Sequence, residues 1–206
     1  FAAAGYISEE IHQLLNLKSG FLTPNGVESS TFYPTELPPT DELRFMWVGN
    51  PGRSHHGINK GFHTIIKPVL DEFTELGVSL VTATPDNPVA REHMGDFYRD
   101  NHVLICASLH EGGPMPIVES LACGRPIITT NVGVVPEIVD HGSNGLIFTR
   151  SRKALRDVIH KISENRSLIS EMGKYTTDSV IDRTAECMAE SYDKMFDYVF
   201  NTSRSE

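Results

Sequence analysis

The chain has 206 residues, of which 39% are hydrophobic and 22% are charged, as in an ordinary folded globular protein. Its formal net charge is -9 and its pI is about 5.4, and no cluster of Lys and Arg stands out along the chain. Because binding to nucleic acid requires a basic surface that neutralises phosphates, these values argue against a nucleic-acid partner.

The cysteines and the apolar segments bear on the cellular compartment. Cys106, Cys123 and Cys187 lie far apart and include no CxxC pair, which predicts reduced thiols and a cytoplasmic location. No apolar run reaches the roughly 20 residues of a membrane span. Because the sequence begins with Phe1 rather than Met, we expect a piece of a longer protein, with membrane association only through the missing part.

Residues 1–40 are predicted to be the end of a preceding domain and a linker. A helix is expected over about residues 6–17, with Ser8 as its N-cap and apolar side chains at helical spacing. The turn signals around Asn25 and the prolines at positions 34, 38 and 39 then predict an extended connection.

Residues 41–182 are predicted to form a Rossmann-like domain. Apolar runs alternate there with amphipathic stretches, which is the pattern of an α/β fold with a parallel sheet and helices on both faces. Strands are expected near residues 44–49, 78–83, 102–107, 126–130 and 145–148. Helices are expected near residues 60–76, 89–99, 115–123, 135–140, 151–163 and 167–179.

Residues 183–206 are predicted to be a C-terminal helix and a tail. The helix is expected near residues 184–200, where apolar side chains recur on one face. The helix carries more acidic than basic residues, which is the wrong sign for an anionic lipid surface. We therefore expect its apolar stripe to pack against protein.

The segment "HEGGPMPIVESLACGRP", residues 110–126, follows a predicted strand. In an open parallel sheet, ligands bind beyond the carboxyl ends of the strands, so a binding loop is expected here. Gly112 and Gly113 would let a ligand approach the backbone. Pro114 or Pro116 suits the first turn of the helix that follows, and Gly124 suits its end.

The start of this helix is a candidate phosphate site, because its free N–H groups and its dipole both face the loop. Glu119, one turn inside the helix, would repel a phosphate but can accept two hydrogen bonds from a vicinal diol such as a ribose. Glu111 could hold a second polyol, and the whole would then be a nucleotide-sugar site. The alternative is that Glu119 only complements the helix dipole and that Glu111 is a solvated loop residue.

The spacing of the two glutamates, E-x7-E within "SLHEGGPMPIVESLACGRPIITTNVGVVPEIVDHGSNGLIF", resembles the C-terminal, donor-binding domain of retaining GT-B glycosyltransferases of the family 4 type, the glycosyl transferases group 1. Other segments resemble that family in the same order: "TPNGVESSTFYP" its linker, "VGN" to "NKGF" its first strand and basic loop, and "PEIVDHGSNGLIF" its later signature. The resemblance extends more weakly over nearly the whole chain.

This resemblance implies roles for particular residues. Glu119 would hold the ribose hydroxyls and Glu111 would contact the donor sugar. Lys60 and Arg53 would neutralise the pyrophosphate and stabilise the leaving group, so that Glu111, Lys60 and Arg53 are the candidate catalytic residues. The other candidate substrate-binding residues are Gly112, Gly113, Met115, Pro116, Gly49, Asn50, Gly133 and Val134.

The implied reaction transfers a hexosyl group from a nucleoside diphosphate sugar to a hydroxyl acceptor, with retention of configuration. No cofactor and no essential metal are expected, and the adjacent His55 and His56 lack a third metal ligand at suitable spacing. The expected partners are the nucleotide sugar and an N-terminal acceptor-binding domain of the same protein. The chain by itself is therefore expected to bind a donor but to turn over little.

The chain also departs from the family pattern. Val134 stands where relatives often have a second glycine, and Pro114 removes one possible N–H donor. One βα unit near the nucleobase is missing, and residues 84–87 are the candidate substitute. The alternatives are a non-catalytic nucleotide- or partner-binding module of this fold and a GT-B epimerase or phosphorylase. A dinucleotide site fits poorly, because Gly49 and Gly52 lack a third glycine.

Overall fold

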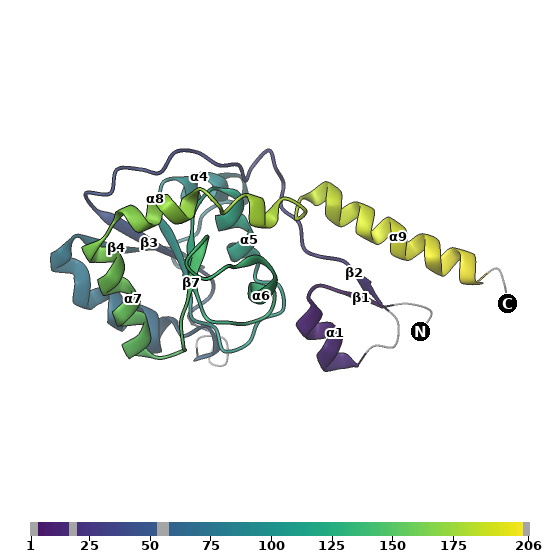
Figure 1. Ribbon diagram of the computed structural model, residues 1–206, viewed down its shortest axis with the longest axis horizontal. Helices are drawn as coiled ribbons and strands as arrows, with labels where there is room; N and C mark the ends of the chain where they lie inside the picture. The colour runs from purple at the N-terminus through teal and green to yellow at the C-terminus, as the bar shows by residue number, and fades with distance from the viewer. Residues whose placement is uncertain (1–3, 17–19, 53–57, 204–206) are drawn as a thin grey trace.

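A central sheet of five parallel strands organises the chain (Figure 1), whose computed structural model describes residues 4–16, 20–52 and 58–203. The strand order is β4-β3-β5-β6-β7. The strands are β3 Leu43–Val48, β4 Val78–Ala83, β5 Val103–Cys106, β6 Ile127–Thr129 and β7 Gly145–Ile147. The predicted α/β class is confirmed, and the five predicted strands are confirmed to within about one residue at either end.

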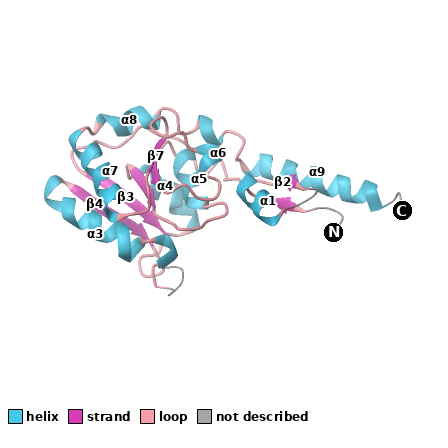
Figure 2. Cartoon of the chain, turned by 60° about the horizontal axis from the view of Figure 1, so that its bottom comes forward, coloured by secondary structure: helices cyan, strands magenta, loops and turns pink. Residues whose placement is uncertain are grey.

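Helices cover both faces of this sheet (Figure 2), because alternate strand residues are apolar on both sides. Phe45 and Trp47 of β3 pack on one face, against the helical segment η1 Phe62–Ile66, α3 Lys67–Leu70 and η2 Asp71–Leu76, and against α7 Arg152–Glu164 and α8 Ser167–Gly173. Met46 packs on the other face, against α4 Met94–Arg99, α5 Met115–Ala122 and α6 Val135–Ile138. The predicted helical layers are therefore present.

The helix expected near residues 60–76 has an irregular backbone. Its first part is a π-helix, and regular α-helical geometry is limited to α3. Pro68 has no N–H, so the carbonyl of Thr64 lacks its usual helical donor. Arg152 Nε donates to this carbonyl at 2.6 Å, and α7 is thereby attached to the irregular turn.

The single helix predicted over residues 167–179 is wrong. The structure has α8 Ser167–Gly173 and then a separate 3-10 turn, η4 Asp178–Val180. Hydroxyl groups between them bond to nearby carbonyls: Thr176 Oγ1 to Gly173 O at 2.9 Å, and Ser179 Oγ to Thr176 O at 2.6 Å. Such local bonds offer the backbone an alternative to continuing the helix.

The N-terminal segment and the last helix lie together, beside the main domain (Figure 1). Helix α1 Glu9–Leu15 begins with Ser8 as N-cap, as predicted. Two short parallel strands that the sequence did not predict, β1 Gly5–Tyr6 and β2 Phe21–Leu22, flank it. Helix α9 Ala185–Ser203 contacts β2, where the rings of Phe21 and Tyr198 lie 5.3 Å apart. Helix α9 therefore contacts the N-terminal segment, whereas Tyr192 and Phe196 of its apolar stripe are 37% and 51% exposed.

A buried arginine attaches the linker to the domain. Arg125 is fully buried, and its guanidinium makes six hydrogen bonds, three of them to groups of the linker and three to groups outside it. The acceptors are Asn101 O, Cys123 O, Arg99 O, Thr35 O, Thr35 Oγ1 and Glu36 O. Burial lowers the pKa of Arg125 to about 10. The extended linker is thus bound through its backbone to the helix layer that carries α5.

Candidate functional site

The strand order defines where a ligand would bind. The connection from β3 leads to β4 at one edge of the sheet. The connection from β4 then crosses β3 to reach β5, so the two connections run in opposite directions from β3. Loops at the carboxyl ends of two such strands form the usual ligand crevice of an open α/β sheet. Gly49 and Asn50 follow β3, and the loop before α5 follows β5. The expected position of the glycine loop, after β5 and before α5 at this edge of the sheet, is confirmed.

Lys60 and Glu111 meet at this edge, although 51 residues separate them along the chain. Lys60 Nζ donates to Glu111 Oε1 at 2.8 Å, and Ser108 Oγ donates to the same oxygen at 2.8 Å. The side chains of Lys60 and Glu111 are 26% and 16% exposed, so the ion pair is accessible from the edge of the sheet. The structure therefore brings together two of the three candidate catalytic residues.

Arg53, the third candidate, lies outside the described residues, as do His55 and His56. Among the residues that the structure does describe, no group of three or more His, Cys, Asp or Glu side chains is arranged to hold a metal ion. The described loop resumes at Ile58, two residues before Lys60.

Glu119 lies on α5 with internal partners on both carboxylate oxygens. Only 3% of the residue is exposed. Tyr98 of α4 donates its hydroxyl hydrogen to Glu119 Oε2 at 2.7 Å, and Arg91 Nη1 donates to Glu119 Oε1. Each carboxylate oxygen can accept a second hydrogen bond, so these contacts leave acceptor capacity for a diol.

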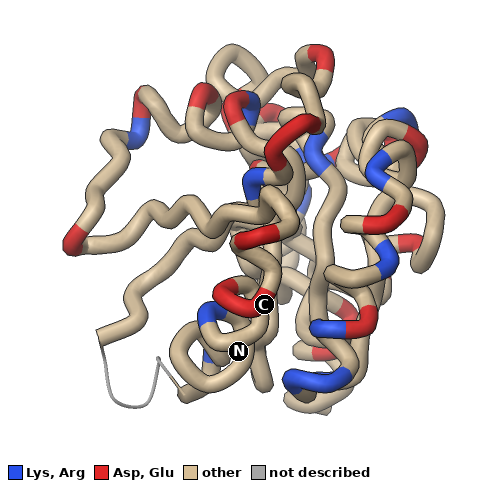
Figure 3. Tube along the Cα trace, turned by 90° about the vertical axis from the view of Figure 1, so that its left-hand side faces the viewer, with Lys and Arg blue, Asp and Glu red and all other residues tan. Residues whose placement is uncertain are grey.

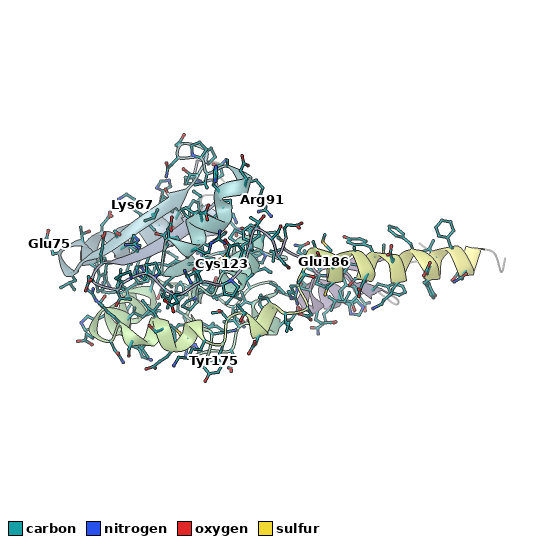
Figure 4. All side chains as sticks on the ribbon, turned by 90° about the horizontal axis from the view of Figure 1, so that it is seen from above. Lys67, Glu75, Arg91, Cys123, Tyr175 and Glu186 are labelled. Atoms are coloured by element: carbon teal, nitrogen blue, oxygen red, sulfur yellow. The ribbon has the colours of Figure 1, made fainter. Side chains whose placement is uncertain are left out.

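Arg91 precedes α4 in the short turn η3 Arg91–His93, and its side chain is 61% exposed. Its guanidinium lies 4.8 Å from the centre of the Phe32 ring. Figure 4 shows Arg91 on the opposite side of the domain from α7 and α8. Neither Arg91 nor Tyr98 could be recognised from the sequence, because their relation to Glu119 depends on the packing of α4 against α5.

Gly112 and Gly113 are covered by the N-terminal segment. A Cβ atom added to Gly112 would lie 3.0 Å from the Cδ1 atoms of both Ile7 and Ile11. Asn25 Nδ2 donates to Gly113 O at 3.2 Å. The glycines therefore allow a close approach, as predicted, but in this structure the approaching groups belong to the chain itself.

Helix α5 begins at Met115, with Pro114 as its N-cap and Pro116 in its first turn. The left-handed Gly124, with φ of +78°, follows the C-cap, as predicted. Pro116 has no N–H, and Ile117 N donates to Pro114 O at 3.0 Å, so Met115 is the first-turn residue whose N–H is left for a ligand.

Gly133 holds a second loop against the Glu111 loop. Its φ is +57°, and an added Cβ would lie 2.3 Å from Gly112 O and 2.8 Å from Glu111 O. Only glycine fits such a contact. The side chain of the next residue, Val134, is buried in the apolar cluster under α5, so at this position only the backbone is available to a ligand.

Lys60 and Glu111 line a narrow cavity of about 20 Å³, and two larger hollows open at the carboxyl ends of the strands. One of about 270 Å³ lies at the carboxyl ends of β3 and β4, where Gly49, Asn50, Thr84 and Pro85 line it. The predicted substitute for the nucleobase site, residues 84–87, contributes to this hollow. The other, of about 390 Å³, lies at the ends of β5, β6 and β7, and the sequence analysis did not anticipate it. Its polar lining residues are Ser108, Thr130, Asn131, Thr149 and Arg150.

Glu137 has partners that the sequence did not indicate. Its carboxylate accepts hydrogen bonds from two distant groups, in addition to lying in the first turn of α6, where an acid complements the helix dipole. These donors are Glu9 N at 2.9 Å and Arg183 Nη2 at 2.9 Å. Arg183 is 6% exposed, and its buried Nε has no hydrogen-bond partner among the described residues. Glu137 therefore links α6 to α1 and to the segment before α9.

Charge is mixed over the surface. In Figure 3, Lys and Arg positions are interspersed with Asp and Glu positions along the part of the chain that faces the viewer. Within the described part of the chain, no helix is both long enough and apolar enough to cross a bilayer.

Sequence comparison links part of the chain to a protein family. Residues 87–179 match the family described as Glycosyl transferases group 1. D-inositol 3-phosphate glycosyltransferase of Rhodococcus opacus (strain B4) is 28% identical over 164 residues, which are 75% of this chain and 34% of that protein. The chain thus spans about a third of this relative's length. The family match includes Glu111, Glu119 and Arg91.

Solved structures show the same fold at low sequence identity. Sucrose-phosphate synthase from Thermosynechococcus elongatus has a TM-score of 0.74 at 19% identity, over 97% of this chain and 59% of that one. The C-terminal domain of a glycosyl transferase group 1 family protein from Francisella tularensis has a TM-score of 0.62 at 18% identity, over 77% of this chain and 98% of that one. Anabaena HepE in complex with UDP has a TM-score of 0.69 at 12% identity, over 95% of this chain and 64% of that one.

The fold is therefore that of the Rossmann-like C-terminal domain of GT-B proteins. The family match adds a similarity to the glycosyl transferases group 1 over less than half of the chain.

Proposed function

We propose that the chain is the donor-binding half of a retaining glycosyltransferase of the family 4 type. The observation that carries this proposal is the contact of Lys60 Nζ with Glu111 Oε1 at the point where the sheet connections diverge, beside the start of α5. A cation, a carboxylate and the positive end of a helix dipole at one place can bind a pyrophosphate and a sugar hydroxyl together.

Lys60 and Glu111 have complementary roles in this proposal. An ammonium group has three donor hydrogens, so Lys60 can keep its bond to Glu111 and still donate to a phosphate oxygen. Placed beside the pyrophosphate, it stabilises the charge that develops on the departing nucleoside diphosphate. Glu111 orients the ammonium group and accepts from a sugar hydroxyl. Arg53 belongs to the same basic loop and is proposed to share the charge.

Glu119 is proposed to bind the ribose. Its carboxylate is already oriented by Tyr98 and Arg91, and acceptor capacity remains on both oxygens. Arg91 is largely exposed, so its side chain can turn aside when a diol approaches. The hollow at Thr84 and Pro85 lies at the same edge of the sheet and is the proposed place for the base. Anabaena HepE, which has the same fold, was solved with UDP.

In the proposed reaction, the bond between the anomeric carbon and the diphosphate oxygen breaks, and a bond from that carbon to the acceptor hydroxyl oxygen forms on the same face. The acceptor proton leaves with the nucleoside diphosphate. No cofactor or essential metal takes part, because Lys60 and Arg53 supply the positive charge. The acceptor is held by an N-terminal domain of the same cytoplasmic protein, and the chain alone turns over little.

Calorimetric titration with UDP, GDP and ADP tests this proposal. We expect saturable binding of one of them, weakened at least about tenfold (roughly 1.4 kcal/mol) by Glu119→Ala. Glu72→Ala is the matched control, because that carboxylate pairs with Arg156 on the far face of the sheet and should not affect binding. If the wild-type chain binds none of the three nucleotides, the proposal fails and a non-catalytic module of this fold is favoured.

A further inference from the structure

We infer that Asn59 is a positioning residue. It attaches the loop that carries Lys60 to the loop that carries Glu111, and so holds the Lys60 ammonium group in contact with the Glu111 carboxylate. The consequence for ligand binding rests on the proposed function, because it assumes that the Lys60–Glu111 pair receives the pyrophosphate.

Asn59 forms a two-way clamp with the residue before Glu111. Its Nδ2 donates to His110 O at 3.0 Å, and His110 N donates back to its Oδ1 at 3.2 Å. The backbone adds a third bond, from Leu109 N to Asn59 O at 2.8 Å. Because Asn59 and His110 are the immediate neighbours of Lys60 and Glu111, the clamp sets the separation of the two backbones from which the ion pair extends.

Arg150 strengthens the same junction from the loop after β7. Its Nε donates to Ala107 O at 2.8 Å, and its Nη2 donates to Ile58 O at 2.6 Å and to Asn59 O at 3.3 Å. Gly61 allows the close approach, since a Cβ there would lie 2.7 Å from Ala107 O. The three loops that follow β3, β5 and β7 therefore meet at Asn59.

The clamp matters because a lysine side chain is flexible. Holding its ammonium group at one place costs conformational entropy, and that cost falls when the backbone on both sides of the ion pair is already fixed. Lys60 and Glu111 are partly exposed, so water competes for both charges. Small displacements of such a pair lower its ability to stabilise a bound diphosphate.

The clamp is also separable from the stability of the fold. The bonds between Asn59 and His110 lie at the surface, so water can replace them when the side chain is removed. Asn144 provides a buried control, because its side chain makes the same kind of two-way clamp, to Ile138 O and from Asp140 N, each at 2.9 Å, and its variant is compared only where it remains folded. That clamp holds the loop before β7 and touches neither Lys60 nor Glu111.

A ligand-free experiment tests the positioning directly. Lysine acylation, followed by mass spectrometry, gives the labelling rate of Lys60 relative to Lys67, which serves as an internal reference. We expect Asn59→Ala to raise this ratio about threefold, as for the loss of a partly exposed ion pair. Glu111→Gln should raise the ratio by the same amount, and the variant that combines Asn59→Ala with Glu111→Gln should show no further rise in the ratio. An unchanged ratio in Asn59→Ala, or an equal rise in Asn144→Ala, would overturn the inference.

A second experiment connects the clamp to the ligand. The affinity for UDP, or for whichever diphosphate binds, is compared with that for the corresponding nucleoside, which lacks the phosphates. Asn59→Ala and Lys60→Ala should each weaken diphosphate binding about tenfold and leave nucleoside binding unchanged. In the double variant, the loss of binding free energy should be smaller than the sum of the two single losses.

The outcomes separate the two hypotheses. If the wild-type chain binds no diphosphate, the proposed function fails. The labelling result still decides whether Asn59 positions Lys60. If Lys60→Ala weakens binding and Asn59→Ala does not, the proposed function stands and the positioning inference is wrong.

Discussion

The hydroxyl of Tyr98 on α4 donates to Glu119 Oε2 on α5 at 2.7 Å, and the phenol is completely buried. This bond joins the two helices that lie under the candidate site, and it orients the carboxylate that we propose for ribose binding. Burial, together with the adjacent charge of Glu119, raises the pKa of Tyr98 well above its usual value.

Tyr98→Phe should destabilise the fold, because it leaves a buried carboxylate oxygen without its donor. We expect a loss of about 1–3 kcal/mol in the free energy of unfolding, measured in urea at neutral pH. Tyr175→Phe is the control, since that side chain is exposed. Equal stability of the two variants would show that the bond between Tyr98 and Glu119 contributes nothing.

Alkaline pH should have a similar effect on the wild-type chain. Because the pKa of Tyr98 is higher in the folded than in the unfolded state, its stabilising effect is complete below about pH 10, the usual pKa of tyrosine. The effect is lost as the pH rises through the folded pKa. Unfolding measurements between about pH 9 and pH 12 should show a steeper loss of stability above about pH 10 for wild type than for Tyr98→Phe. Parallel curves would contradict this assignment.

Gly133→Ala should displace the loop that carries Glu111. An alanine there has an unfavourable positive φ and a Cβ too close to the carbonyl of Gly112, so we expect a loss of more than about 2 kcal/mol and weaker nucleotide binding. Gly142→Ala is the matched control, because its φ is +89° but an added Cβ would meet no atom within 4 Å. It should lose about 1 kcal/mol and bind normally. Equal losses would show that contact with Gly112 is unimportant.

Glu137→Ala should release α1 from the domain. It removes the acceptor for Glu9 N and leaves the buried guanidinium of Arg183 without its carboxylate, so we expect a loss of about 2 kcal/mol or more and faster proteolysis near α1. Glu72→Ala is the control. It removes an exposed partner from Arg156 and should have little effect on the free energy of unfolding or on proteolysis near α1. Unaltered proteolysis of Glu137→Ala would contradict the tether.

The cysteines should differ in reactivity. Cys123 lies inside the domain (Figure 4), and burial raises its pKa to about 11 from 9.0. At neutral pH this shift alone makes its thiolate roughly 100-fold scarcer, in addition to the steric protection. Cys187 on α9 is partly exposed. Iodoacetamide should therefore label Cys187 first and Cys123 only on unfolding, which mass spectrometry of the native chain would show; equal rates would contradict the buried placement.

Local signals in the sequence were sufficient for much of the fold. The period of apolar residues located the five strands of the sheet, Ser8 marked the start of α1, and Gly124 marked the end of α5. These signals are reliable because each depends on backbone preferences within a few neighbouring residues. The same reasoning missed β1 and β2, since two-residue strands have no pattern of their own and form only by pairing.

For the candidate site, the sequence identified the residue types but not their partners. The glycine loop, both glutamates and Lys60 were found from motif spacing and family resemblance. That Lys60 meets Glu111, that Arg91 and Tyr98 hold Glu119, and that Asn59 joins two loops were decided by the tertiary structure alone. The physical reason is that these contacts join segments tens of residues apart, and only the strand order and the packing of α4 on α5 bring their side chains within hydrogen-bonding distance.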